Sequence, residues 1–197
     1  MNILLLGPDR PHLVAYLESL GDTVTRHEKK LKGDSPVLDG IDFVVSYGYQ
    51  YILKDAVLAR FPGRVVNLHI SLLPWNRGRD PNLWSFLEDT PKGVTIHYID
   101  RGVDTGHLIA QREVTFGTEG TLRTTYDELS RTIEELFREQ WPAIREGRND
   151  SRPQPTGGSS HRGKDKEPYM HLLHSGWDTP VAELIGKALS SAKREDG

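Results

Sequence analysis

The stretch DFVVSYGYQYILKDAVLARFPGRVVNLHI, residues 42–70, decides the fold. It opens with a continuous apolar run of the kind that parallel sheets bury. Residues 54–61 then have the composition of a short helix, which Pro62 and Gly63 end, and residues 65–70 form a second apolar run. A strand, a helix and a strand in this order predict a right-handed crossover between two parallel strands.

The sequence on the amino-terminal side of this stretch repeats the pattern. Residues 2–6 read as a strand, residues 12–20 as an amphipathic helix, and residues 23–27 as another strand. The alternation predicts an α/β fold with a Rossmann-like, doubly wound, mainly parallel sheet. In such a sheet, ligands bind beyond the carboxyl ends of the strands. Asn67 and His69 are expected at one such end.

The central part of the chain continues with strands and a long helix. Residues 71–82 have a loop composition and are a candidate substrate clamp, and residues 83–88 suggest a short helix. Two β-branched runs, residues 93–100 and 107–115, flank the turn-rich sequence DRGVDTG. Residues 121–146 carry apolar side chains at helical spacing, which predicts a long amphipathic helix.

The last fifty residues differ in composition. Residues 147–168 are rich in Gly, Pro and Ser, so we expect an extended segment, and Asp178 or Thr179 could cap a final helix. We therefore expect one domain over residues 1–146 and a helical and extended C-terminal appendage, residues 147–197, that packs on or near it.

Composition excludes several classes of function. The net charge of −3 provides no basic field for a nucleic acid, and the absence of cysteine excludes disulfides, thiolate zinc sites and cysteine nucleophiles. The eight histidines form no close metal-binding spacing, so we expect no metal. The first apolar run, MNILLLG, is too short for a signal peptide or a membrane span. We expect a cytoplasmic protein without a membrane or nucleic-acid partner.

The residues most suited to carry out a chemical reaction lie in NLHISLLP, residues 67–74. Asn67 and His69 are two residues apart on one strand and therefore project from the same face. An amide can donate to a carbonyl oxygen, and an imidazole, whose ordinary pKa is about 6.5, can exchange a proton near neutral pH. Asp104, in the later loop, could face His69. Each residue alone could equally cap a strand or form a turn, so their joint order favours a catalytic set.

NLHISLLP and the later GVTIHYIDRGVDTG, residues 93–106, together resemble the folate-dependent formyltransferases. The resemblance covers roughly residues 1–145 and implies transfer of a formyl group from 10-formyltetrahydrofolate to a primary amine. It implies that Asn67, His69 and Asp104 are the catalytic residues, and that residues 1–146 form the catalytic domain. The folate contacts that it implies are Tyr51, Ile52, Leu53, His97, Asp100 and Val103.

The acceptor amine is inferred from the loop WNRGRDPNLWS, residues 75–85, which resembles nucleotide-sugar N-formyltransferases. Arginines suit phosphate, polar side chains suit hydroxyls, and a tryptophan suits stacking. The candidate substrate contacts are Arg10, Trp75, Arg77, Arg79, Asp80 and Asn82. An arginine of this loop could instead brace it against a carboxylate, and Trp84 could belong to the core.

Other activities are also compatible with the sequence. The short loop GPDRPH, residues 7–12, lacks a full glycine-rich phosphate loop, which disfavours glycinamide ribonucleotide as the amine but leaves it, or another small amine, as an alternative. A methionyl-tRNA enzyme would need a second domain. A formyltetrahydrofolate hydrolase and a non-catalytic folate-binding protein are alternatives of other classes. A homodimer is expected by resemblance.

Overall fold

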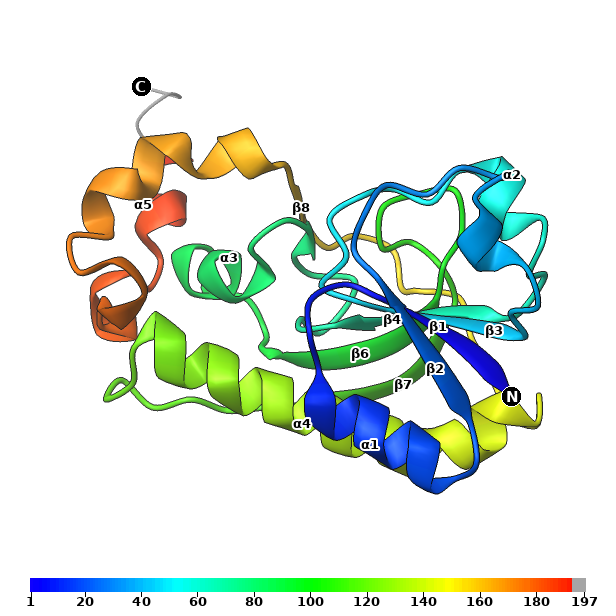
Figure 1. Ribbon diagram of the computed structural model, residues 1–197. Coiled ribbons are helices and arrows are strands. Elements are labelled where there is room, and N and C mark those ends of the chain that lie inside the picture. The colour runs from blue at the N-terminus through cyan, green and yellow to red at the C-terminus, as the bar shows by residue number, and fades with distance from the viewer. Residues whose placement is uncertain (193–197) are drawn as a thin grey trace. The chain divides into compact units, whose positions relative to one another are not determined.

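The computed structural model of the protein describes residues 1–192, which form two compact units (Figure 1). Each unit is built from three segments of the chain. Unit 1 contains residues 1–69, 96–110 and 134–154. Unit 2 contains residues 70–95, residues 111–133 and the chain from Pro155 onward.

A six-stranded sheet runs in the order β2-β1-β3-β4-β6-β7. Its strands are β1 (Asn2–Leu6), β2 (Thr23–His27), β3 (Phe43–Tyr47), β4 (Val65–His69), β6 (Gly93–Tyr98) and β7 (Leu108–Glu113). The first four are parallel: β1 pairs with both β2 and β3, and β3 pairs with β4. The chain order therefore reverses direction between β1 and β3, which confirms the doubly wound, mainly parallel sheet.

β6 runs against β4. The amide of Ile99, just past the end of β6, donates to the carbonyl of Val65 at the start of β4. Further along β4, the side chain of Asn67 lies beside that of His97. Residue numbers thus fall on β6 as they rise on β4, which is the antiparallel arrangement. This direction brings His97 next to the end of β4 that carries the predicted catalytic pair.

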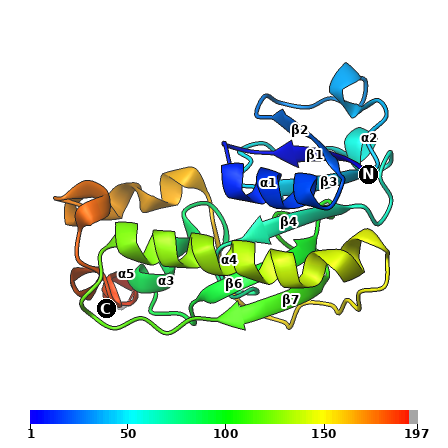
Figure 2. The ribbon, with the colours of Figure 1, turned by 60° about the horizontal axis from the view of Figure 1, so that its bottom comes forward.

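Helices cover both faces of the parallel strands in unit 1. Figure 2 shows α1 (Pro11–Ser19) and the unit 1 half of α4 (Leu122–Arg145) on one face, and Figure 1 shows α2 (Asp55–Leu58) on the other. Because β1 is apolar on both faces, Ile3 to Leu6 are all at most 1% exposed. Phe43 meets Trp141 of α4 edge to face at 5.0 Å. The sheet therefore has a core on each side, as a buried parallel sheet requires.

Pro142 lies inside α4 and removes one helical hydrogen bond, because proline has no N–H to donate to the carbonyl of residue 138. Tyr16 of α1 replaces that donor: its hydroxyl donates to the carbonyl of Arg138 at 2.9 Å. Partial burial raises the pKa of Tyr16 above its ordinary value of 10.0. The bond therefore supplies a donor to the Arg138 carbonyl, which Pro142 leaves without its helical partner, and it joins α4 to α1.

Unit 2 contains α3 (Pro81–Leu87) and most of the C-terminal residues. Leu83 and Trp84 of α3 pack with Leu122, at the start of α4, and with Val181 and Leu184. Two short strands, β5 (Arg77–Gly78) and β8 (Ser160–His161), pair in parallel. The remaining elements are the 3-10 helix η1 (Pro36–Leu38) in unit 1 and η2 (Gly163–Leu172), η3 (Gly176–Asp178), η4 (Val181–Glu183) and α5 (Lys187–Ala192) in unit 2.

The predicted final helix from Asp178 or Thr179 is wrong. That segment contains the single turn η4 and then α5, separated at Gly186, which has φ of +69° and whose amide donates to Phe86 instead of continuing a helix. The extended segment predicted at residues 147–168 also contains β8 and the start of η2. Residues 193–197 of the predicted appendage lie outside the described part. Over residues 1–192, every helix is too short or too polar to cross a membrane.

We expect Tyr16→Phe to lower the free energy of unfolding by about 1 kcal/mol, because the Arg138 carbonyl loses its donor. Because the folded-state pKa of Tyr16 is raised, its contribution is complete below pH 10.0 and is lost as the pH rises through the raised value. Urea unfolding at pH 7 and above pH 10 measures both effects. Equal stability of the variant and the wild type at pH 7 would contradict the role of this bond.

Candidate active site

Asn67 and His69 occupy the carboxyl end of β4 in unit 1 and project from one face, as predicted. Asn67 is half-buried, and His69 is 6% exposed. The register places Asn67 opposite Ser46 of β3, while His97 of β6 lies on its other side. The pair is therefore held between two neighbouring strands.

Asp104 reaches this pair from the loop between β6 and β7. Its Oδ1 accepts a hydrogen bond from Asn67 Nδ2 at 3.1 Å, and its Oδ2 lies 3.7 Å from His69 Nδ1. The carboxylate side chain is 15% exposed. Asn67, His69 and Asp104 thus form one polar cluster, which we call the β4 cluster. It combines an amide, an imidazole and a carboxylate within hydrogen-bonding reach or slightly beyond it.

His97 is a fourth member of the neighbourhood and is 1% exposed. Its Nδ1 lies 2.8 Å from the carbonyl of Tyr98, so we assign the ring proton of the neutral imidazole to Nδ1. Its Nε2 is then an acceptor, and Asn67 Nδ2 lies 3.2 Å from it. Both N–H groups of the Asn67 amide are consequently directed, one to His97 and one to Asp104. His97, which the resemblance predicts as a folate contact, lies against Asn67.

The loop that carries Asp104 has a tightly defined conformation. Asp104 has φ of +53°, a left-handed conformation that is uncommon for residues other than glycine. Asp100 Oδ1 accepts hydrogen bonds from the Gly102 amide at 3.0 Å and from the Thr105 hydroxyl at 2.6 Å. Gly106 approaches β6 so closely that a Cβ there would lie 1.8 Å from the Tyr98 carbonyl oxygen. These contacts determine where the Asp104 carboxylate points.

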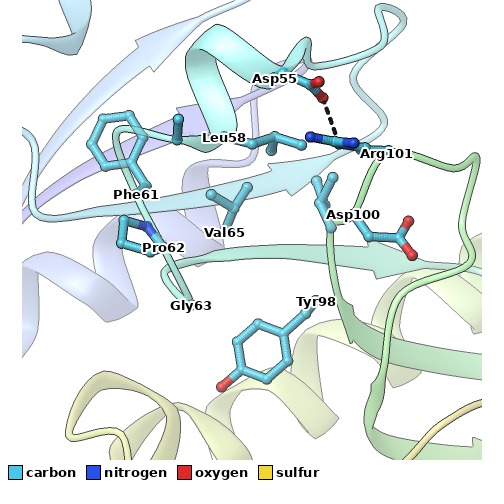
Figure 3. A pocket seen from close by; sticks show the side chains of 11 residues that line it. Asp55, Leu58, Phe61, Pro62, Gly63, Val65, Tyr98, Asp100 and Arg101 are labelled. Carbon is cyan, nitrogen blue, oxygen red and sulfur yellow. Dashed lines mark ion pairs between the residues drawn. The ribbon is translucent and has the colours of Figure 1, made fainter.

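A cavity of about 400 Å³ lies between α2 and this loop in unit 1 (Figure 3). Apolar side chains, among them Leu58 and Val65, form much of its wall. Asp100 also lines it, and Arg101 pairs with Asp55 at 3.2 Å. Its other lining residues are Ala59, Phe61, Pro62, Gly63, Tyr98 and Ile99. A flat, mostly apolar ring with polar edges suits such a space.

Four further folate candidates lie on the loops around this cavity, outside its lining. Ile52 and Val103 are 53% and 43% exposed. Leu53 is 6% exposed and packs in the core with Val57. Tyr51 lines a different cavity, of about 290 Å³, beside Gly7, Pro8, Glu28, Gly48, Tyr49 and Gln50.

The predicted substrate loop lies in unit 2. Arg77 and Arg79 donate their backbone amides to Ser159 and His161, which holds the loop to β8. The Arg77 side chain also donates to the carbonyl of Gly157 at 3.4 Å. Arg79 is exposed, and no described residue pairs with its guanidinium group. Trp75 is half-buried, and its carbonyl accepts a hydrogen bond from Ser71.

The remaining substrate candidates have protein partners. Asp80 pairs with Lys166 at 2.8 Å, and Asn82 is 2% exposed and donates to the carbonyl of Leu122. Arg10, in unit 1, lies 3.9 Å from the ring centroid of Tyr47. Trp84 belongs to the core, as its alternative interpretation held: it is 4% exposed and stacks on His161 at 3.8 Å.

Sequence reasoning missed one residue that binds the loop carrying Asp104. Gln154 donates to the carbonyls of Asp104 and Gly106 from a segment that we expected to be only extended. No motif or periodicity singles out a glutamine between two prolines, so the sequence offered no signal. Among residues 1–192, no group of three or more metal-ligating side chains is positioned to hold an ion.

The chain resembles known proteins over most of its length. A family model described as formyl transferase matches residues 13–139. The crystal structure of the formyltransferase PseJ from Anoxybacillus kamchatkensis, in complex with UDP-4,6-dideoxy-4-formamido-L-AltNAc and tetrahydrofolate, matches with a TM-score of 0.93. The two sequences are 60% identical, and the match covers 95% of this chain and 100% of that chain.

Two more distant structures share the fold. Rv3404c from Mycobacterium tuberculosis, which has been suggested to be a sugar N-formyltransferase, is 27% identical, with a TM-score of 0.71 over 85% of this chain and 77% of that chain. Phosphoribosylglycinamide formyltransferase from Bacillus halodurans is 22% identical, with a TM-score of 0.59 over 70% of this chain and 92% of that chain.

Proposed function

Because the chain belongs to the formyl transferase family, we propose that it transfers a formyl group from 10-formyltetrahydrofolate to the amino group of a nucleotide-linked amino sugar. The observation that carries the proposal is the β4 cluster, which places an amide, an imidazole and a carboxylate around one point. The nature of the acceptor is supported by PseJ, which is 60% identical over its whole length and is complexed with a UDP-linked formamido sugar.

The chemistry of acyl transfer fits the three side chains. The donor supplies the formyl group, and negative charge develops on the formyl oxygen as the amine adds to the formyl carbon. Asn67, by releasing one of its present acceptors, and His69 would donate to that oxygen. The nitrogen that adds must lose a proton, and the nitrogen that leaves must gain one. Asp104 would hold a water molecule that accepts the first proton and passes it to the leaving nitrogen.

The residues around the 400 Å³ cavity fit a reduced pterin. A pterin is a flat bicyclic ring with polar atoms along its edge, and Leu58 and Val65 offer apolar surface for its faces. The backbone of the Asp100–Asp104 loop and the Asp100 side chain offer polar groups for its edge. The exposed side chains of Ile52 and Val103 would be covered by the remainder of the folate.

We further propose a cytoplasmic homodimer. A nucleotide sugar is too highly charged to cross a bilayer unaided, so an enzyme that uses one must share its compartment. Large apolar side chains are exposed in the C-terminal segment of unit 2, and a dimer interface would cover them. They are Met170, Trp177, Ile185 and Leu189. Sedimentation equilibrium distinguishes a dimer from a monomer.

The activity is tested by incubating the protein with 10-formyltetrahydrofolate and a panel of nucleotide-linked amino sugars, and by reading the mass of each product. A gain of one formyl group on a sugar supports the proposal. If only glycinamide ribonucleotide gives a formylated product, then it, and not a nucleotide sugar, is the acceptor. Release of formate without any acceptor would indicate the hydrolase, and binding of tetrahydrofolate without any turnover would indicate a folate-binding protein.

In that assay we expect His69→Ala and Asp104→Ala each to lower kcat by about a hundredfold or more, because each removes a group that acts on the charge or the proton of the reaction. Circular dichroism should show a folded protein in both cases. Near-normal turnover by either folded variant would rule out the assignment of that residue.

Arg79→Ala tests the acceptor site. Among residues 1–192 the exposed Arg79 guanidinium has no partner, and such a group is suited to a diphosphate. We therefore expect the KM for the nucleotide sugar to rise about tenfold while the KM for the folate stays unchanged. Arg64→Ala, at an exposed arginine that belongs to unit 1 and not to the substrate loop, is the matched control. An unchanged acceptor KM in the Arg79 variant would remove this residue from the substrate contacts.

A further inference from the structure

The segment that follows α4 runs along the outside of the catalytic loop in unit 1. Arg152 and Leu108 exchange backbone hydrogen bonds in both directions, at 2.8 and 3.0 Å. Asn149 accepts a hydrogen bond from the Tyr98 hydroxyl at 3.1 Å. Residues 149–154, which we call the strap, are thereby attached to β6 and β7 on both sides of the loop that carries Asp104.

Gln154 connects the strap to the loop itself. Its Nε2 donates to the carbonyl of Asp104 at 2.7 Å and to the carbonyl of Gly106 at 3.0 Å. A primary amide has two N–H groups, so one side chain can supply both donors. The two carbonyls flank Thr105, whose hydroxyl is bound to Asp100. The loop is therefore held from one side by Asp100 and from the other by Gln154.

The hydrogen bond from Gln154 to the Asp104 carbonyl helps to determine where the Asp104 carboxylate points. Asp104 has φ of +53°, a conformation that costs free energy and persists only where surrounding contacts enforce it. The carbonyl group and the side chain of Asp104 are attached to the same Cα, so a rotation of the backbone there also turns the carboxylate. Without a donor on its carbonyl, the residue can relax toward an ordinary conformation, and its carboxylate then moves away from Asn67 and His69.

We propose that Gln154 is a positioning residue for formyl transfer, which fixes the Asp104 carboxylate by binding the carbonyls on either side of Thr105. The proposal rests on the proposed function. Both hydrogen bonds from the Gln154 amide end on backbone carbonyl oxygens, so this side chain acts through the backbone of Asp104. Because a displacement of about 1 Å can slow a positioned reaction about a hundredfold, the effect should appear in kcat.

The test uses the full-length protein with Gln154→Ala and Gln154→Glu. The glutamate has nearly the same shape, but when ionised it has no N–H and opposes two carbonyl oxygens, so it should be the slower of the two. We expect kcat to fall about tenfold for alanine and further for glutamate, while KM for the acceptor and for the folate changes less than about threefold. Asn149→Ala is the matched control, because it loses a strap hydrogen bond that does not reach the Asp104 loop.

Hydrogen exchange provides a readout that does not need activity. The Gly102 amide, which donates to Asp100 within this loop, should exchange faster in both Gln154 variants and at the wild-type rate in Asn149→Ala. Normal kcat in Gln154→Glu, unchanged exchange of the Gly102 amide, or an equal loss of kcat in Asn149→Ala would each overturn the proposal. A wild-type protein that transfers no formyl group to any amine would instead overturn the proposed function, and exchange would still show whether Gln154 holds the loop.

Discussion

The hydrogen bond from Asn67 to Asp104 attaches the loop between β6 and β7 to the carboxyl end of β4. Asn67 is fixed by β4, which is buried between β3 and β6, whereas Asp104 belongs to a loop with largely exposed neighbours. The bond can form only if the loop turns back along the sheet, and that turn depends on the left-handed conformation of Asp104 and on the close approach of Gly106 to Tyr98. The reactive geometry is thus a property of the loop as much as of the strand.

The sequence predicted the strand side of this arrangement well. DFVVS and VVNLHI are apolar enough to be buried on both faces, so their assignment as parallel strands followed from burial. The common face of Asn67 and His69 followed from the two-residue repeat of a strand. The contact with Asp104 could not be derived in the same way, because no local sequence pattern determines the path of the loop back toward β4. His97 illustrates the same limit: its place beside Asn67 depends on the antiparallel direction of β6.

Prediction failed where short-range turns replace regular periodicity. The C-terminal residues form 3-10 turns whose amides bind distant carbonyls, such as that of Val181 to Gly120, and helical spacing carries no information about such partners. Leu53 shows a related ambiguity, because an apolar residue next to a ligand loop can serve the core or the ligand; here it is buried with Val57. Gln154 is a third case, since its partners are backbone carbonyls about fifty residues away.

The distribution of residues between the two units suggests how chemistry and specificity are separated in this chain. The β4 cluster, the cavity proposed for the pterin and the strap are each complete within unit 1, whereas all the acceptor candidates except Arg10 belong to unit 2. Formyl transfer requires the same charge stabilisation and proton movement whichever amine reacts, so unit 1 is constrained by the reaction. Under the proposed function, unit 2 is constrained by the shape and charge of the acceptor. Its loop is held to β8 by backbone hydrogen bonds, and the Arg79 guanidinium has no partner within residues 1–192. A loop held in this way can exchange its side chains for a different acceptor without disturbing the residues that carry out the transfer.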